Sequence, residues 1–523
     1  MNRKFAQKII IISLLLVACR ISEAQVLNSS AIDALVERSM KAFDVPGISV
    51  GVIKDGKVIH SKGYGVRSVN TMQKMDENTL VAIGSNTKAF TTTALGILVD
   101  EGKLKWDDKV QTYIPEFKLY NPYVSEEFTI RDLLTHRSGL GLGAGDLMIF
   151  PDGTDFTKKD IIHNLRYLKQ TSSFRSKFDY DNNLYIVAGE VIERVTGKSW
   201  GDFVEERIIR PLGMTGSVAS YSRLKDMSNV TDPHSSVNGK VQVIPHNSLR
   251  VGEAAGAIYS NIADMSKWAQ MLLAGGKYGD GLSQKLISES VHTELWTPQT
   301  ILPVRTPGPY NTHFAAYGLG FGLSDVKGYK QVSHTGGIDG MVTQLTMFPE
   351  LNLGIIVLTN QMEGSAFVSI TNQIKDGYLG RSGTDWVADL TAQRKKQLDQ
   401  AKTITDKIWR EIDEVQKSGK SNIDINLFTG RYTDVWLGDV TISVKNGKPW
   451  FDAKRSPKLT GELLPYKGNT FVVKWADLSM PADAFVNFTL DEEGKASGFT
   501  MRAISPLTDF SFDFHDLNFR RAK

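Results

Sequence analysis

Three short motifs hold the residues of this chain best suited to chemistry: Ser85-Asn86-Thr87-Lys88, Tyr180-Asp181-Asn182 and His334-Thr335-Gly336. The first places a hydroxyl and an amine three positions apart, so that both project from one face of a helix. A hydroxyl becomes a nucleophile when a neighbouring base takes its proton, and a lysine can be that base once burial lowers its pKa. The set therefore indicates a serine hydrolase that uses lysine and tyrosine instead of histidine and aspartate.

The sequence after Ser85 predicts a helix that begins at this residue. Apolar residues occupy nearly every side as far as Val99, and Gly102 follows where helices commonly end. A helix that is apolar all round is buried, so only its N-terminal tip would be open. There the helix dipole and the Ser85 N–H could stabilise an oxyanion. An isolated Ser-x-x-Lys is more often a capping serine followed by a solvated lysine.

The other two motifs supply groups that could move protons and bind substrate. Tyr180 precedes an amphipathic helix at 183–196 and could shuttle a proton to the leaving group. Asn182 could donate a hydrogen bond to a substrate amide. The small residues after His334 would let a substrate lie along the strand edge, and the Gly337 N–H could complete the oxyanion hole. The predicted substrate-binding residues are Asn182, His334, Thr335 and Gly336.

Each motif is weak alone, because similar spacings recur. Ser-x-x-Lys also begins at Ser222 and Ser324, and Tyr259-Ser260-Asn261 competes with Tyr180, although the small residues before it indicate packing around a turn. Ser49 lies in a literal Gly-x-Ser-x-Gly, but a hairpin is predicted there and not the strand–serine–helix elbow. The histidines are scattered without zinc-site spacing, so no metal or cofactor is expected.

As an ordered set, the motifs resemble those of the penicillin-recognising serine hydrolases: class C β-lactamases, DD-peptidases, D-aminopeptidases and related esterases. These families carry Ser-x-x-Lys, Tyr-x-Asn and Lys- or His-Thr-Gly. Within about residues 30–380, further similar stretches are 129–140, 210–214 and 335–340. The resemblance implies Ser85 as nucleophile and Lys88 with Tyr180 as the general-base pair. It places His334 beside the site.

The third motif begins with His334, where dedicated β-lactamases usually have lysine. A fixed lysine charge attracts the substrate carboxylate, whereas histidine is mostly neutral at pH 7. This argues against an efficient β-lactamase. It favours a peptidase or amidase for D-residue-containing or cell-wall-type peptides and leaves a carboxylesterase or weak β-lactamase open. The alternative of another class is a non-catalytic ligand-binding or scaffold protein, against which the retained Ser-Lys-Tyr set argues.

The elements around the motifs predict an α+β, β-lactamase-like domain in which helices flank an antiparallel sheet, because strands at both ends enclose a mostly helical middle. Ser29 or Ser30 is the expected N-cap of the first helix. The predicted elements are helices at 29–43, 87–101, 183–196 and 262–273, and strands at 47–53, 57–64, 329–333, 341–348 and 353–359.

The chain changes character after about residue 383. Residues 383–424 are charged and helical, which predicts a linker helix on a surface. From 425 to 523, turn signals alternate with runs rich in Val, Phe, Tyr and Trp, which predicts an all-β module, a sandwich or small barrel. It resembles the lipocalin-like barrel appended to some family members. The hydrolase domain is expected at 25–382, after a signal peptide at 1–24.

The N-terminal segment predicts export. Basic residues precede an apolar run at 9–18 that is too short to span a membrane comfortably, which favours a signal peptide. Ser22-Glu23-Ala24 fits ordinary cleavage, whereas Leu16-Val17-Ala18-Cys19 resembles a lipobox that would make Cys19 a lipid anchor. Both interpretations predict a periplasmic or secreted protein, and the lipobox interpretation also predicts that Cys19 anchors it to the membrane.

The composition of the chain argues against nucleic acid as a partner. The 523 residues exceed one ordinary core and carry a net charge of +3, which is no electrostatic footprint for nucleic acid. Cys19 is the single cysteine, so the mature protein has no internal disulfide. The expected partner is a small-molecule or peptide substrate, and the sequence leaves the oligomeric state open.

Overall fold

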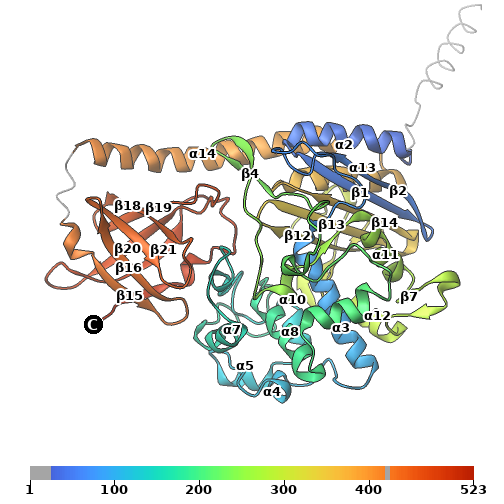
Figure 1. The fold of residues 1–523 in the computed structure, drawn as a ribbon, viewed down its shortest axis with the longest axis horizontal. Helices are drawn as coiled ribbons and strands as arrows, with labels where there is room; N and C mark the ends of the chain where they lie inside the picture. The colour runs from blue at the N-terminus through green and yellow to red at the C-terminus, as the bar shows by residue number, and fades with distance from the viewer. Residues whose placement is uncertain (1–24, 419–423) are drawn as a thin grey trace, which may run out of the picture.

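The computed structural model describes residues 25–418 and 424–523, so the predicted signal peptide and Cys19 lie outside the described residues. Figure 1 shows a mixed domain and a β-barrel placed side by side, with the long helix α14 (Trp386–Ser418) running past both. Of the helices in the described ranges, none combines the length and apolar character needed to cross a bilayer.

An eight-stranded antiparallel sheet forms the centre of the first domain. The hairpin of β1 and β2 turns at Asp55-Gly56, where both residues have positive φ, as a tight Asp-Gly hairpin turn requires. β1 then pairs with β14, with Val50 opposite Val357, which joins the two ends of the domain. In sheet order the strands are β2 (Lys57–Gly65), β1 (Gly47–Lys54), β14 (Leu353–Thr359), β13 (Met341–Phe348), β12 (Tyr329–Ile338), β11 (Gly322–Val326), β10 (Ala315–Tyr317) and β9 (Thr300–Leu302).

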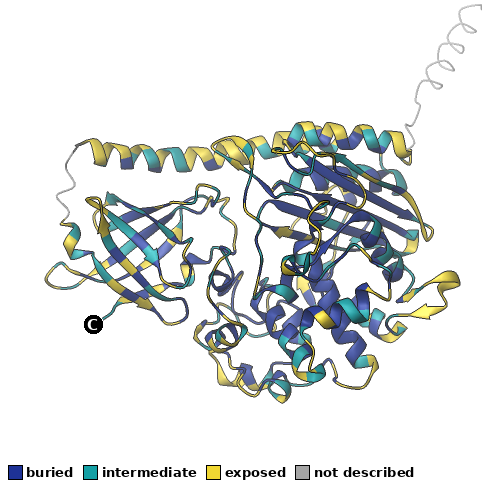
Figure 2. Cartoon of the chain, viewed as in Figure 1, coloured by how far each residue is buried: buried dark blue, intermediate teal, exposed yellow. Residues whose placement is uncertain are grey.

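Helices cover both faces of this sheet, each over its own apolar core (Figure 1). α2 (Ser29–Phe43) and α13 (Gly364–Tyr378) lie on one face. α3 (Thr87–Asp100) is buried nearly all round, as Figure 2 shows, and its Phe90 stacks on Trp268 of α11 (Ile262–Leu273) with ring centres 3.9 Å apart. On the second face are α3 (Thr87–Asp100), α8 (Asn183–Thr196), α10 (Glu253–Gly256) and α11 (Ile262–Leu273).

The predicted fold class is confirmed, with two local corrections. The N-cap of α2 is Asn28, and not Ser29 or Ser30, because the Asn28 side chain accepts a hydrogen bond from the Ala31 N–H. β12 extends beyond the predicted 329–333, since its ladder with β13 continues to a tight turn after Ile338. The His334 motif therefore lies inside a strand.

The second domain is a closed barrel, which decides between the two all-β forms expected. Asn446 and Gly447 both have positive φ at the turn between β16 and β17, as a tight hairpin needs. Its interior holds edge-to-face aromatic pairs such as Phe428 with Phe488. The strands are β15 (Gly430–Asp434), β16 (Gly438–Lys445), β17 (Lys448–Ala453), β18 (Thr460–Lys467), β19 (Thr470–Trp475), β20 (Ala484–Leu490), β21 (Ala496–Ala503) and β22 (Asn518–Arg521).

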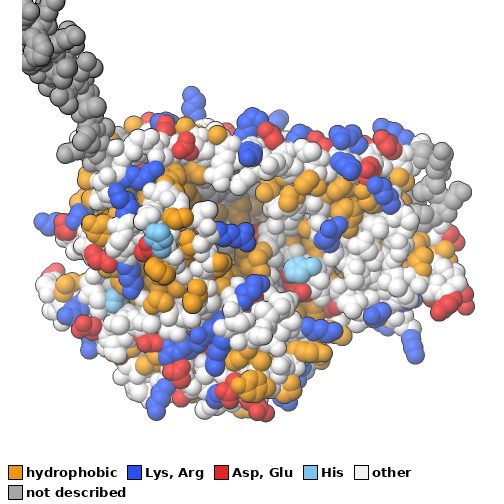
Figure 3. Space-filling view, turned by 180° about the vertical axis from the view of Figure 1, so that it is seen from behind, with side chains coloured by type: hydrophobic (Ala, Val, Ile, Leu, Met, Phe, Trp, Pro, Cys, Tyr) orange, Lys and Arg blue, Asp and Glu red, His pale blue; other side chains and the backbone are white. Residues whose placement is uncertain are grey.

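The two domains meet directly as well as through α14. Arg455 of the barrel bonds Asp155 and Asp160 of the first domain, at 2.6 and 3.0 Å. The Asn164 amide donates to the Trp436 carbonyl at 2.8 Å, and both groups are buried. From behind, Figure 3 shows the surface hollowed near its middle, with hydrophobic side chains around the hollow.

Candidate active site

Ser85 lies in a short 3-10 turn (Gly84–Asn86) that leads directly into α3. Its Oγ is 3.1 Å from the Lys88 Nζ. Ser85 is partly exposed, whereas Lys88 is fully buried. The structure therefore brings the predicted nucleophile and base into hydrogen-bond contact at the open tip of a buried helix.

The Ser85 turn is fixed by contacts that sequence reasoning missed. Gly84 has φ +53°, and a Cβ there would lie 2.5 Å from the Gly337 nitrogen, so only glycine fits. The Asn86 side chain donates to Thr343 Oγ1, which donates in turn to the Ile83 carbonyl, each at 2.8 Å. These contacts hold the Ser85 turn in place against β12 and β13. The sequence carries no signal of this close approach, because a glycine alone does not show which backbone lies beside it.

Lys88 donates to three oxygen atoms: Ser85 Oγ, Asn182 Oδ1 at 2.7 Å and the Ala255 carbonyl at 2.9 Å. The Ala255 segment, expected to be only packing, is α10 and supplies one of these acceptors. Burial lowers the pKa of Lys88 to about 7, against the opposing effect of the Asp146 and Asp181 carboxylates. Near pH 7 the amine is thus available in its neutral form.

Tyr180 lies under the lysine, with Lys88 Nζ 4.8 Å from its ring centre. Burial raises the pKa of Tyr180 well above 10, and the neighbouring Ser85 hydroxyl offsets only part of this effect. The phenol is therefore protonated at neutral pH, which suits a proton donor. Its ring packs between His136 and Phe510, with centre distances of 4.2 and 5.7 Å.

Asn182 links the lysine to a buried carboxylate. Its Oδ1 accepts from Lys88, and its Nδ2 donates to Asp146 Oδ2 at 2.8 Å. Burial, with the charge of Asp181, raises the pKa of Asp146 well above its usual range. Asn182 thus orients the base. The predicted hydrogen bond to a substrate amide would use the second hydrogen of Nδ2.

His334 is buried on β12, 6.4 Å from Tyr180 between ring centres. Its Nδ1 is 2.6 Å from the Thr335 carbonyl, which can only accept, so Nδ1 carries the proton. The Nε2 then accepts from the Tyr317 hydroxyl at 2.8 Å. Burial and the Lys88 charge lower the pKa of His334 to about 4, so the ring is neutral at pH 7.

The residues that follow His334 lie alternately on the two faces of β12. Thr335 and Gly337 face outward and are exposed. Gly336 is buried, and a Cβ there would lie 1.9 Å from the Ile83 carbonyl. Gly336 therefore lets the strand pack against the nucleophile turn, and its substrate contact stays a prediction.

Residues 32–377 match the family model described as Beta-lactamase. This chain belongs to the beta-lactamase family. Members of the family are serine hydrolases. Residues 418–521 match a second model, described as a domain of unknown function, DUF3471. The family match thus covers the mixed domain, and the second match covers the barrel.

Among similar beta-lactamase family relatives is the "Unguisins hydrolase ungD'" of Aspergillus campestris (strain IBT 28561), 32% identical over 347 residues. The match covers 64% of this chain and 62% of that protein. The "Protein flp" of Staphylococcus aureus (strain NCTC 8325 / PS 47) is 26% identical over 337 residues, covering 64% and 63% of the two chains. This chain thus matches under two thirds of each relative's length.

Two solved structures share the fold of this beta-lactamase family protein. The octameric penicillin-binding protein homologue from Pyrococcus abyssi has a TM-score of 0.60 at 22% identity, covering 94% of this chain and 100% of that one. A D-stereospecific amidohydrolase from Streptomyces sp. has a TM-score of 0.54 at 22% identity, covering 67% and 98%. At these identities the likeness shows the fold.

The competing motifs make contacts that differ from those of this beta-lactamase-type site. Ser49 is buried within β1 and donates to the Asp76 carbonyl at 3.4 Å. Tyr259 is buried, with its hydroxyl 3.2 Å from His246 Nδ1. Ser222 pairs with the Ser220 hydroxyl at 3.0 Å, and Ser324 lies in β11. None of these serines is hydrogen-bonded to a lysine among the described residues.

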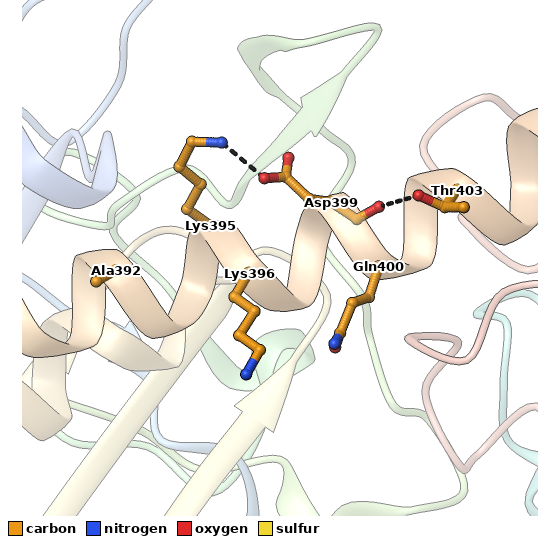
Figure 4. Close-up of a pocket in the computed structure, with 6 residues that line it drawn as sticks. All are labelled: Ala392, Lys395, Lys396, Asp399, Gln400 and Thr403. Atoms are coloured by element: carbon orange, nitrogen blue, oxygen red, sulfur yellow. Dashed lines mark hydrogen bonds and ion pairs between the residues drawn. The ribbon is translucent and has the colours of Figure 1, made fainter.

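A hollow on α14 does not belong to the site. Its volume is about 410 Å³, and Figure 4 shows its lining side chains on a single helix, with Lys395 bonded to Asp399 at 2.6 Å. The hollow is open and holds none of the predicted catalytic residues. Its lining residues are Ala392, Lys395, Lys396, Asp399, Gln400 and Thr403.

Proposed function

We propose that this beta-lactamase family protein cleaves amide or ester bonds through an acyl-enzyme on Ser85. The observation that carries the proposal is the 3.1 Å contact between Ser85 Oγ and a lysine amine whose pKa burial lowers to about 7. Such an amine can take the serine proton at neutral pH. A binding protein would have no need of a buried lysine in this state.

The proposed reaction has two halves. Ser85 Oγ attacks the substrate carbonyl while Lys88 takes its proton, and the N–H groups of Ser85 and Gly337 hold the developing oxyanion. Gly84 brings these two amides together, because its position leaves no room for a Cβ beside the Gly337 nitrogen. Tyr180, protonated by its burial, gives a proton to the leaving group and regains it from Lys88. Water then attacks the acyl ester and gives a proton to Lys88, which passes it to Ser85 Oγ as the C–O bond breaks and the acid leaves.

The proposed substrates are peptides or amides that contain D-residues, with apolar side chains favoured. Neutral His334 offers no fixed charge for a carboxylate, which argues against efficient β-lactam hydrolysis. Apolar surface near the site comes from Phe510, 38% exposed and packed on Tyr180, and from Met362, 44% exposed and next to Gly337. Leu142, 46% exposed, precedes Gly143, whose N–H donates to the Tyr180 carbonyl. Of two similar proteins, the one named a D-stereospecific amidohydrolase supports an amide of D-residues as substrate, and the one named an unguisins hydrolase supports hydrolysis.

The deciding experiment is intact mass after exposure to a fluorophosphonate probe, with Ser85→Ala as control. One adduct on the wild type and none on the variant supports the proposal. Substrate choice follows from rates on D- and L-amino-acid p-nitroanilides, p-nitrophenyl acetate and nitrocefin. No adduct on well-folded protein would favour a non-catalytic binding protein.

Export is proposed on the N-terminal sequence alone, with a periplasmic or secreted location. The mass of the protein recovered from bacterial cells tests it. A mature chain beginning at Gln25 supports ordinary cleavage, and a diacylglyceryl mass on Cys19 supports anchoring. An uncleaved chain that stays in the cytoplasm contradicts both.

A further inference from the structure

The barrel reaches the Ser85 site through the segment between β21 and β22, residues 505–516, which we term the barrel loop. Ser511 of this loop donates from Oγ to Asp146 Oδ2 at 2.8 Å. The same oxygen accepts from Asn182, whose Oδ1 accepts from Lys88. All four residues are less than a tenth exposed, so water does not compete for these bonds.

The barrel loop also holds the backbone on either side of Asp146. Asp513 is fully buried, and its two carboxylate oxygens accept from the Gly145 N–H at 2.7 Å and the Leu147 N–H at 3.1 Å. Ser511 and Asp513 together therefore fix both the side chain and the main chain of Asp146. Because one of these three bonds holds Asp146 itself and two hold the residues on either side of it, the position of Asp146 depends on the docking of the barrel.

A third contact places the barrel loop beside Tyr180. Phe510 meets the Tyr180 ring edge-to-face, with centres 5.7 Å apart, and is 38% exposed. Its carbonyl lies so close to Gly143 that a Cβ there would be 2.7 Å away. The Gly143 N–H donates to the Tyr180 carbonyl at 2.8 Å. Phe510 thus stands at the open side of the site, next to the proposed proton donor.

We propose that the barrel loop completes the active site of the mixed domain. Ser511 is a positioning residue for Lys88, acting through Asp146 and Asn182, and Phe510 is a specificity-determining residue that bounds the substrate space beside Tyr180. This inference rests on the proposed Ser85 chemistry. It gives the barrel, matched only to a domain of unknown function, a role in catalysis.

The hydrogen bonds from Ser511 through Asp146 to Asn182 decide which atom of the Asn182 amide faces Lys88. An asparagine amide can present either oxygen or nitrogen to Lys88, and only the oxygen can accept from the amine. Asp146 selects that orientation by accepting from Asn182 Nδ2. The other Asp146 oxygen has no hydrogen-bond partner among the described residues, so Ser511 is the second group that keeps this carboxyl in place.

The test compares Ser511→Ala with Ser511→Thr, which keeps the hydroxyl, and with Thr508→Ala, a barrel-loop variant whose hydroxyl points to Pro481. The readouts are the maximal inactivation rate and the half-saturating concentration for an alkyl fluorophosphonate, with the melting temperature as folding control. We expect Ser511→Ala to lower the maximal rate about tenfold or more, with half-saturation nearly unchanged, because Ser511 does not touch the probe. Ser511→Thr restores most of the rate, and Thr508→Ala matches the wild type.

Phe510→Ala has a different expected signature. It should change the half-saturating concentration for probes with bulky alkyl groups at least about threefold more than it changes that for short probes. Unchanged selectivity would overturn the role given to Phe510.

The outcomes separate this inference from the proposed function. If the wild type and Ser511→Ala react with the probe equally fast, the positioning role of Ser511 is overturned, and Ser85 remains the nucleophile. A rate loss that Ser511→Thr does not restore also overturns it. A folded wild type that forms no adduct overturns the proposed function and this inference with it. If Ser511→Ala does not fold, Ser511→Cys, similar in size but a weak donor, takes its place with the same expectation.

Discussion

The lowered pKa of Lys88 predicts a pH profile for acylation of Ser85. A fall from the ordinary 10.5 to about 7 leaves about half of the amine neutral at pH 7, against about one in three thousand for an unshifted lysine. The difference amounts to about 5 kcal/mol between the two protonation states. Since only the neutral amine accepts a proton, the rate should rise about tenfold per pH unit below 7 and level off above it.

The assay is the rate of fluorophosphonate adduct formation between pH 5 and 9, in the wild type and in Lys88→Arg. Arginine keeps its proton throughout this range, so the rate of adduct formation in Lys88→Arg should be at least about a thousandfold lower than in the wild type. Lys375→Arg is the matched control, because Lys375 is another buried lysine, with a pKa lowered to about 8 by burial, on the opposite face of the sheet. It should leave the profile unchanged.

Asp181 needs a separate variant, because burial raises its pKa to about 7 and its charge faces Lys88. Asp181→Asn removes an anion that raises the lysine pKa, so the midpoint should move to lower pH. His334 is neutral across this range and adds no step. A flat profile from pH 5 to 9, a midpoint near 10, or more than a tenth of wild-type rate in Lys88→Arg would refute the assignment of Lys88 as base.

Two further predictions concern residues around the nucleophile. Gly84→Ala should lower the labelling rate at least about a hundredfold in folded protein, because the added Cβ would lie 2.5 Å from the Gly337 nitrogen. Gly102→Ala controls for backbone strain, since Gly102 has φ +68° and no atom within 4 Å of an added Cβ. Equal losses of rate in the two variants would contradict the steric reason. His334→Lys should raise kcat/KM for nitrocefin about tenfold or more by supplying a cation for its carboxylate, without a matching gain on p-nitrophenyl acetate. An equal gain in His313→Lys, at an exposed position, would show that net charge alone is responsible.

The parts of the site that depend on local spacing could be predicted from the sequence. Ser85 and Lys88 are three residues apart, on the 3-10 turn and the first turn of α3, so local helical geometry brings them together. The hairpin of β1 and β2 followed from the tight-turn signal Asp55-Gly56 between two predicted strands, and its pairing is observed. The neutrality of His334 was expected from its ordinary pKa, and burial strengthens it.

The parts that depend on tertiary contact could not be predicted. Ser511 and Asp146 are 365 residues apart, and neither stands in a motif. Gly84 and Gly336 are required by a close approach of two backbones, which a glycine in a sequence does not reveal. The end of β12 was missed because its motif carries small residues that resemble a turn, whereas the ladder to β13 keeps them extended.

The contact between Ser511 and Asp146 also has a consequence for the order of events during synthesis. The mixed domain leaves the ribosome first and can build its sheet from its own strands, since β1 and β14 both precede the barrel. Its proposed catalytic lysine gains its last support only when Ser511, 365 positions downstream of Asp146, docks with the folded barrel. Contacts of such long range form late. A hydrolase built in this way is switched on by the completion of its own folding, so a chain that stalls before the barrel has formed carries the nucleophile without full activity.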